Sequence, residues 1–294
     1  MTDSEPGTLF LVATPIGNLG DMSPRGLDAL RGAATVFAED TRRTLKLMRH
    51  FDLPAPLVAL HAHNERERAA DVVRELEAGK DCALVTDAGT PSVSDPGAAL
   101  VRAVVESGHR VVPIPGPSAV LAALAASGFG GDQFAFLGFP PRKGAARSQW
   151  LARARDLDLT IVAFESPRRL GRLLEDLREA GLGEAAACVC RELTKLHEEV
   201  RRGTVTALAD YYRDAEVRGE VTLVVDRRTP PPDEGAEAAR EEAARTAAED
   251  MAARGASTRE MTDALRAEFG LTRNVAYSLA LTAGRRGAEE GEPT

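Results

Sequence analysis

The stretch most informative for chemistry is a turn rich in small polar residues, Thr86-Asp87-Ala88-Gly89-Thr90-Pro91, which follows an apolar run. This turn is too long for a simple connection between a strand and a helix. Gly89 and the small Ala88 allow backbone amides and carbonyls to face a ligand. Asp87 could accept a hydrogen bond from a hydroxyl or balance a sulfonium or an amine. The turn therefore predicts a pocket for a small molecule, and Asp95 beyond it is predicted as a helix cap.

Two further turns follow predicted strands, and ligands in open α/β sheets sit outside the carboxyl ends of the strands. Residues 14–21 contain glycines that allow close backbone approach, but not the G-x-G-x-x-G or lysine-containing pattern of a phosphate loop. In residues 112–119, three prolines around Gly116 make a preset turn. The helix that Ser118 begins offers amides to a carboxylate. A stiff hinge between domains is the alternative role of this turn, and the two roles are compatible.

Charged residues end two later strands. Glu165 ends one of them, just before Ser166-Pro167 opens a helix, and residues 191–195 end another with alternating charges. Arginine and lysine side chains at such a rim can contact phosphate groups. Ion pairing between domains is the alternative role for these side chains.

The elements that must position these residues alternate between short apolar runs and amphipathic segments. Strands are predicted at residues 8–13, 34–38, 57–60, 82–86, 110–114, 134–137, 159–164, 186–190 and 220–225. Helices are predicted at residues 24–30, 41–50, 65–78, 96–106, 118–126, 145–154, 167–180 and 206–212. Alternation of this kind predicts α/β domains with a mainly parallel sheet covered on both faces.

The chain has 294 residues, of which 44% are hydrophobic, so it can bury more than one core. We predict four segments: an N-terminal α/β domain (1–117), a second α/β domain (118–227), a linker (228–236) and a helical appendage (237–294). Three consecutive prolines favour an extended linker. The appendage has predicted helices at 237–254, 258–269 and 273–283. Its helix–Gly–helix layout resembles a helix-turn-helix, and a plain helical hairpin fits equally well.

The net charge of −8 argues against a basic nucleic-acid-binding surface over the whole chain, although local arginine pairs leave room for a cationic face. The three cysteines argue against a disulfide framework. We predict no metal site, because Cys188 and Cys190 are expected to point to opposite faces of a strand. No apolar run is long enough to span a bilayer, and the N-terminus is unlike a signal peptide, so we predict a cytoplasmic protein without a membrane partner.

These motifs, in this order, resemble those of one subgroup of the tetrapyrrole methylase-like (class III) methyltransferases, over about residues 8–226. Two more segments carry the resemblance, Ala38-Glu39-Asp40-Thr41-Arg42 and His63-Asn64-Glu65. The subgroup is that of the 16S ribosomal RNA (cytidine 2′-O-ribose) methyltransferases. The resemblance implies a homodimer of two-domain chains with S-adenosylmethionine in the cleft between the domains. It also implies small ribosomal subunit RNA as the partner and cytidine 1402 of the decoding centre as the target.

Carried over by position, the resemblance places nine residues against the cofactor, and the chemistry of the main turn adds Asp87. The nine are Leu19, Ala88, Gly89, Thr90, Val93, Ser118, Ala119, Glu165 and Leu193. Tetrapyrrole-modifying relatives tend to carry an apolar residue near the position of Glu165. An acidic residue there favours a hydroxylated or charged substrate.

In the leading hypothesis, a ribose 2′-hydroxyl attacks the methyl group of the sulfonium in line. An alcohol is a poor nucleophile at neutral pH, so a positioned base or a strong hydrogen-bond acceptor should help. The candidate acceptors are Asp40, Glu65 and Glu165. An ion pair with Arg42 or Arg43 is the alternative role for Asp40.

Three cations, Arg42, Arg168 and Lys195, are candidates for holding flanking RNA phosphates, and the position of Arg168 is often histidine in the subgroup. A second hypothesis is methylation of a tetrapyrrole precursor or of a protein side chain on the same fold. A third is a regulator that binds RNA or DNA without catalysis and reads DNA with the helical appendage. The appendage provides only a weakly basic recognition helix, because Glu260, Asp263 and Glu268 dilute its arginines.

Overall fold

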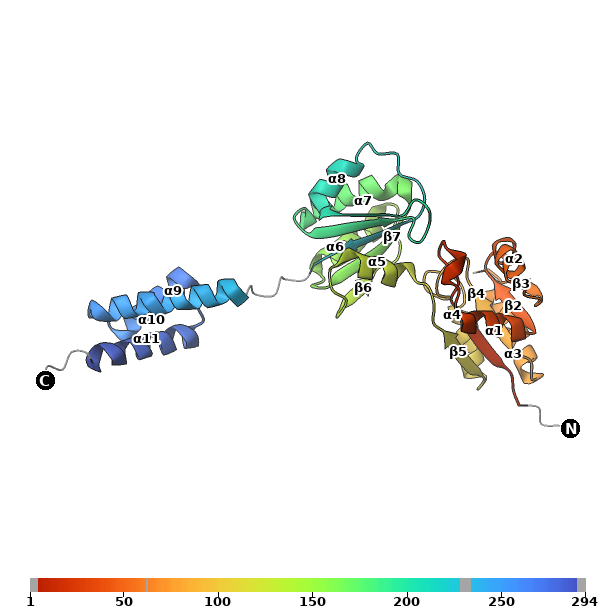
Figure 1. Cartoon of the computed structure of the whole chain (residues 1–294), viewed down its shortest axis with the longest axis horizontal. Coiled ribbons are helices and arrows are strands. Elements are labelled where there is room, and N and C mark those ends of the chain that lie inside the picture. Colours follow the sequence, from red (N-terminus) through yellow and green to blue (C-terminus); the bar gives the residue numbers. More distant parts are fainter. Residues whose placement is uncertain (1–4, 62, 228–233, 290–294) are drawn as a thin grey trace. The chain divides into compact units, whose positions relative to one another are not determined.

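Two five-stranded sheets with their helices, and a separate group of helices, make up the chain (Figure 1). The computed structural model describes residues 5–61, 63–227 and 234–289. Residues 1–228 and 229–294 form two compact units, and the first contains both sheets. The predicted α/β class with a C-terminal helical stretch is therefore confirmed.

The first sheet and its helices, here called the N-terminal lobe, are built from the first half of the chain. The strands are β1 (Thr8–Val12), β2 (Thr35–Ala38), β3 (Leu57–Ala59), β4 (Cys82–Val85) and β5 (Arg110–Ile114). The helices are α1 (Pro24–Gly32), α2 (Thr41–His50), α3 (Glu65–Glu77) and α4 (Ala98–Glu106), with a 3-10 turn at Leu19–Asp21. The strand order is β3-β2-β4-β1-β5, and every pairing is parallel, as the alternation predicts.

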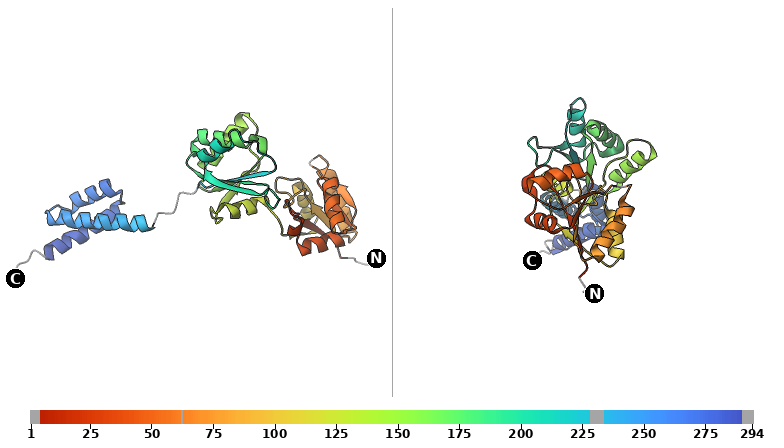
Figure 2. Two further views of the ribbon diagram at one scale, coloured as in Figure 1. Left: turned by 45° about the horizontal axis from the view of Figure 1, so that its top comes forward. Right: turned by 90° about the vertical axis from the view of Figure 1, so that its right-hand side faces the viewer.

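Strand β4 shows why this sheet is covered on both faces. Successive side chains of a strand point to opposite faces. Cys82 and Leu84 are buried in one apolar cluster, whereas Ala83 and Val85 are buried in another. Residues of α3 and α4 join the first cluster, residues of α1 and α2 join the second, and Figure 2 shows helices on both sides of the sheet. A strand buried on both faces has no polar alternation, which is why it appears in the sequence as a continuous apolar run.

The second sheet and its helices, here called the C-terminal lobe, follow. The strands are β6 (Phe134–Phe136), β7 (Thr160–Glu165), β8 (Ala186–Arg191), β9 (Glu199–Thr204) and β10 (Val221–Val225). The helices are α5 (Ala119–Ser127), α6 (Gly144–Asp156), α7 (Leu170–Leu177) and α8 (Val205–Tyr212). Short helical turns at Pro167–Arg169 and Arg178–Leu182 flank α7, so the helix predicted over 167–180 is divided in three.

The second sheet corrects the sequence analysis in two ways. Its order is β6-β7-β10-β8-β9, and only β6 and β7 pair in parallel. Strand β9 was not predicted, because Glu199, Arg201 and Arg202 interrupt any apolar pattern along it. A charged edge strand of this kind is recognisable only once its partner β8 is known.

Cys188 and Cys190 lie on the same face of β8, not on opposite faces as expected. Residues two apart in a strand share a face, and both cysteines are buried in the apolar cluster that includes α5. Their sulfur atoms are 3.7 Å apart. Within the described residues, no group of three or more His, Cys, Asp or Glu is arranged to hold a metal ion.

The C-terminal unit is a cluster of three helices, α9 (Glu234–Ala253), α10 (Thr258–Phe269) and α11 (Arg273–Glu289). Alanines dominate its core, together with Met261 and Leu265. Ser257 and Glu260 form a reciprocal capping box at the start of α10, and Gly270 ends that helix at φ +60°. Helix α9 begins three residues before the predicted appendage, and residues 228–233 of the predicted linker lie outside the described part of the chain. None of the described helices is both long and apolar enough to cross a bilayer.

Candidate functional site

A cavity of about 440 Å³ is lined by residues from both lobes. Its size lies within the range of pockets that hold small molecules. The N-terminal lobe contributes the main turn at positions 87–90 and 93–95, and the C-terminal lobe contributes the start of α5, the end of β7 and the segment 219–222. Side chains outside these segments also line it, namely Ile16, Glu39, Arg43 and Phe139.

Eight of the ten residues predicted to contact the cofactor line this cavity. They are Asp87, Ala88, Gly89, Thr90, Val93, Ser118, Ala119 and Glu165. Leu19 instead lines a neighbouring hollow of about 170 Å³, which shares Arg43 and Asp87 with the main cavity. Leu193 is 9% exposed and does not line the cavity. It belongs to an apolar cluster with Ile16 and Val120, which do line it. Contact of each residue with a cofactor stays a prediction.

Backbone contacts fix the main turn. Thr14 and Gly89 exchange two backbone hydrogen bonds, each 2.9 Å long, which tie the first turn to the main turn. Gly89 has φ +88°, a conformation that other residues adopt only with strain. The sequence therefore places a glycine at the point where these two turns meet.

The start of α5 is the second wall of the cavity. Ser118 caps the helix through its side chain, which accepts from the amide of Leu121, and Ser118, Ala119 and Val120 all line the cavity. The first amides of a helix lack partners within the helix and favour an anion. This wall can therefore hold a carboxylate.

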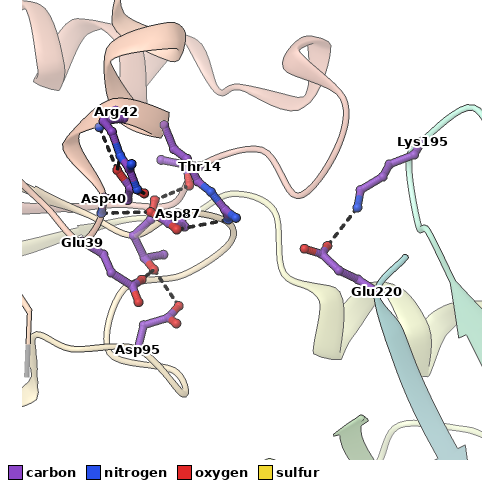
Figure 3. Close-up of polar contacts among 10 residues, drawn as sticks. Thr14, Glu39, Asp40, Arg42, Asp87, Asp95, Lys195 and Glu220 are labelled. Atoms are coloured by element: carbon purple, nitrogen blue, oxygen red, sulfur yellow. Dashed lines mark hydrogen bonds and ion pairs between the residues drawn. The ribbon is translucent and has the colours of Figure 1, made fainter. Parts of the chain in front are cut away.

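A third wall is acidic: Glu39, Asp87 and Asp95 gather there (Figure 3). Asp87 accepts from the amide of Asp40 at 3.0 Å and pairs with Arg43 at 3.1 Å. Asp95 does not cap α4 as predicted, because Gly97 occupies the cap position. This wall suits a positively charged group.

One hydroxyl on this wall lies between two carboxyl groups. The Thr86 Oγ1 atom is 2.9 Å from Glu39 Oε2 and 2.6 Å from Asp95 Oδ2. A hydroxyl has a single proton and can donate to only one of them. Burial raises the pKa of Asp95, the nearby charges of Glu39 and Asp87 raise it further, and the hydrogen bond from Thr86 lowers it. The net effect is that the pKa of Asp95 is raised above its ordinary value.

Glu165 ends β7 and lines the cavity. The residue is 2% exposed. Its Oε1 atom accepts from the amide of Ser166 at 2.6 Å and pairs with Arg169 at 2.5 Å. Its Oε2 atom is buried and has no hydrogen-bond partner among the described residues. A buried carboxylate oxygen without a partner is costly unless a ligand supplies one. Glu165 is thus the candidate acceptor that the structure leaves available.

Asp40 is held by its neighbour Arg42 (Figure 3). It is not among the residues that line the cavity. Arg42 donates from Nε at 3.2 Å and from Nη2 at 3.0 Å, and its amide donates to the Asp40 carboxylate that caps α2. These hydrogen bonds lower the pKa of Asp40 to about 2. So weak a base favours the alternative role of an ion pair.

We expect Asp40→Asn to keep turnover close to that of the unmodified chain, because asparagine caps a helix as well as aspartate does. The stabilising effect of the Asp40 charge should be present above the ordinary pKa near 4 and lost as the pH falls towards about 2. Measurement of kcat with saturating cofactor tests this, and Asp28→Asn is the control on an exposed pair. A large fall in kcat with normal cofactor binding would restore Asp40 as the base.

Glu65 binds the start of α4 and does not line the cavity. Its Oε1 atom accepts from the amides of Gly97, Ala99 and Leu100 at 3.0, 2.6 and 3.2 Å. A carboxylate that accepts several amides at a helix N-terminus is a stabilising cap from another element. The structure thus gives this second candidate base a structural position.

We expect Glu65→Ala to lower the free energy of unfolding by about 1 to 2 kcal/mol and to leave kcat close to normal. Urea unfolding and turnover should be measured on the same preparation. Glu67→Ala, an exposed change on the same helix, serves as the control. A fall in kcat without a loss of stability would contradict this assignment.

Two of the three cations predicted to hold RNA phosphates already have carboxylate partners. Arg42 pairs with Asp40, and Lys195 pairs with Glu220 at 3.0 Å (Figure 3). Lys195 also pairs with Glu192 at 2.7 Å. Burial alone would lower the pKa of Lys195, but these two hydrogen bonds raise it overall. Arg168 is exposed and pairs with no described carboxylate, so it is the free cation of the three.

Sequence reasoning missed several residues that line the cavity: Glu39, Asp95, Phe139, Phe164 and Glu220. Glu39 lies in a segment that carries the family resemblance, next to the candidate base Asp40. Phe139 had a signal of its own, because an aromatic residue between glycine and proline in a loop is unusual for a core position.

The family model of the Tetrapyrrole (Corrin/Porphyrin) Methylases matches residues 8–209, more than half of the chain. The chain belongs to the tetrapyrrole methylase family. Among solved structures, this methylase resembles the "Uroporphyrin-III C-methyl transferase from Thermus thermophilus complexed with S-adenyl homocysteine". The TM-score is 0.54 at 19% identity, covering 74% of this chain and 97% of the other, which shows a shared fold.

Curated relatives of this methylase are far more similar in sequence. A "Ribosomal RNA small subunit methyltransferase I" of Synechocystis is 41% identical over 275 residues, covering 94% of this chain and 98% of the relative. A protein of the same name from Pseudomonas aeruginosa is 46% identical over 239 residues, covering 80% and 85%. The first of these alignments is long enough to include most of the C-terminal helices.

Proposed function

We propose that this chain methylates the ribose 2′-hydroxyl of a cytidine in small-subunit ribosomal RNA, with S-adenosylmethionine as the methyl donor. The observation that carries the proposal is the cavity, which brings the main turn, the start of α5 and Glu165 together in a tetrapyrrole methylase. The names of the relatives at 41% and 46% identity support ribosomal RNA as the substrate class. The motif resemblance supports cytidine 1402 as the target.

The residues present fit the donor. The acidic wall, with Glu39, Asp87 and Asp95, suits the amine and the sulfonium, and the amides at the start of α5 suit the carboxylate. Ile16 and Val93 offer apolar surface beside them. The strongest sign that a ligand belongs here is the buried Oε2 atom of Glu165, which has no partner within the described residues.

S-adenosylmethionine, when bound, supplies an electrophilic methyl group. Glu165 accepts the proton that the ribose hydroxyl loses, because the residue lines the cavity, its Oε2 atom has no partner among the described residues, and its Oε1 atom is held by Ser166 and Arg169. This arrangement orients the carboxylate before the substrate arrives. Alignment of the reactants in the cavity provides a further large part of the rate.

The test is methyl transfer from radiolabelled S-adenosylmethionine to isolated small ribosomal subunits that lack the modification. Mapping of ribose methylation in that RNA, with and without the protein, should give one new site at cytidine 1402. Incorporation into a tetrapyrrole precursor but not into the subunits would overturn the proposal. Incorporation at a different nucleotide would correct the target alone.

The same proposal includes a homodimer of this methylase acting on ribosomal particles in the cytoplasm. It rests on the resemblance, which extends over both lobes. Sedimentation equilibrium of the full chain should give twice the mass of one chain, and a single-chain mass would contradict the homodimer.

A further inference from the structure

One of the residues that line the cavity is an exposed phenylalanine. Phe139 is 55% exposed and lines the cavity together with the half-buried Phe164. The ring centroids of Phe139 and Phe164 are 5.4 Å apart. Phe164 also contacts Phe136, with ring centroids 4.9 Å apart. A large apolar side chain that remains this exposed beside a pocket is a candidate binding surface.

The loop that presents Phe139 is held in place. Gly138 has φ +61° and accepts a hydrogen bond from the amide of Phe164 at 3.0 Å. Beyond the phenylalanine, Pro141 accepts from Arg147 at 2.9 Å, and Arg147 is anchored by a buried ion pair with Asp176. The ring is therefore presented by a supported loop, which lowers the entropy lost when a ligand stacks on it.

The cavity has an acidic wall inside and exposed cations outside, and this distribution of charge limits the kind of ligand that can bind. The acidic wall repels a phosphate from the interior. Outside, Arg142 and Lys143 follow Phe139 on the same loop, and Arg168 follows the cavity-lining Pro167. These three cations are exposed, and none pairs with a carboxylate in the described part of the chain. A neutral flat group inside and phosphates outside is the pattern of an unpaired nucleotide.

We propose that Phe139 is the platform on which a base of the substrate RNA stacks, with Arg142 and Lys143 holding the adjacent phosphates. Resting on the proposed function, this inference names the residues that hold the nucleotide. Stacking on aromatic side chains and a cationic path along the backbone are the general means of binding single-stranded RNA. The ring orients the nucleotide so that its ribose faces Glu165.

The test compares Phe139→Ala, Phe139→Leu and Phe139→Tyr in the full chain. Loss of the ring should raise the KM for small subunits about 10-fold or more, with the dissociation constant for S-adenosylmethionine unchanged in calorimetry. Tyrosine should restore most of the affinity and leucine little. Phe134→Leu, at a partly exposed phenylalanine that does not line the cavity, is the control.

The phosphate contacts have a separate readout. Replacing Arg142 and Lys143 with glutamine should weaken the salt dependence of binding to small subunits. The slope of log affinity against log salt concentration should fall in magnitude by about 1.4, because each phosphate contact contributes about 0.7 to the slope for single strands. The same change at Arg102 and Arg110, exposed arginines of the N-terminal lobe, should leave the slope unchanged.

The outcomes separate the two proposals. Weaker S-adenosylmethionine binding by Phe139→Ala would assign the ring to the cofactor and overturn the base platform. An active enzyme whose KM is unchanged in Phe139→Ala, or equal in the leucine and tyrosine variants, would overturn it as well. A wild-type chain that neither methylates nor binds small subunits would overturn the proposed function and the platform together.

Discussion

Replacement of Glu165 by glutamine lowers kcat for methyl transfer about 100-fold or more if its Oε2 atom accepts the substrate proton, since a positioned base contributes at least that factor. Glutamine keeps the size of the side chain and an oxygen that can accept from Ser166 and Arg169. It removes the negative charge and the capacity to take up a proton. The expected result is a fall in kcat with little change in the KM for either substrate.

Three measurements make this interpretation secure. Calorimetry should show normal binding of S-adenosylmethionine, and thermal unfolding should show a folded protein. Glu179→Gln, an exposed glutamate of the same lobe, should have normal turnover. If Glu165→Gln binds the cofactor and turns over at the normal rate, alignment alone accounts for catalysis and Glu165 has no role as a base.

Asp176→Ala should cause the largest loss of stability, about 3 kcal/mol or more, because it leaves a buried charge without its partner. Asp176 is 6% exposed and pairs with Arg147 at 2.5 Å and with Arg172 at 2.7 Å. The Arg147 side chain is itself only 11% exposed. Urea unfolding of the full chain, followed by a probe of the first unit such as the fluorescence of its single tryptophan, Trp150, measures the change.

The matched control for this prediction is Asp156→Ala in the same lobe. Asp156 pairs with Arg155 at 2.8 Å, but both side chains are more than half exposed, and exposed pairs contribute little. No measurable loss is expected there. If both variants lose the same stability, burial is not what makes the Asp176 pair important.

The sequence predicted the N-terminal lobe well and the C-terminal lobe less well, for a physical reason. Strands buried on both faces, such as β4, appear as apolar runs bounded by turns and are easy to recognise. Strand β9 carries charges along an edge, and its pairing with β8 depends on a chain reversal that no local pattern specifies. The antiparallel order of the second sheet was therefore beyond local reasoning.

The candidate site also has features that the sequence predicts and features that it does not. The backbone-lined turns could be predicted because glycine permits the positive φ of Gly89 and the prolines near Gly116 restrict the backbone directly. The ion pair of Asp40 with Arg42 could be offered as an alternative because the two residues are near neighbours in the sequence, whereas the roles of Glu65 and Glu165 could not be predicted. Glu65 binds amides about 32 to 35 residues away, whereas the Oε2 atom of Glu165 has no described partner. The two glutamate candidates are thus distinguished by contacts that only the folded chain provides.

The edges of the two sheets have a consequence for how copies of the chain can associate. Each sheet ends on one side in a strand of only three residues, β3 or β6. On the other side, β5 contains Pro113, which lacks an amide hydrogen, and β9 is charged. Short, proline-containing and charged edges resist the addition of a further strand. The chain is thereby protected against edge-to-edge aggregation, and helices and loops are left as the surfaces on which another molecule can dock.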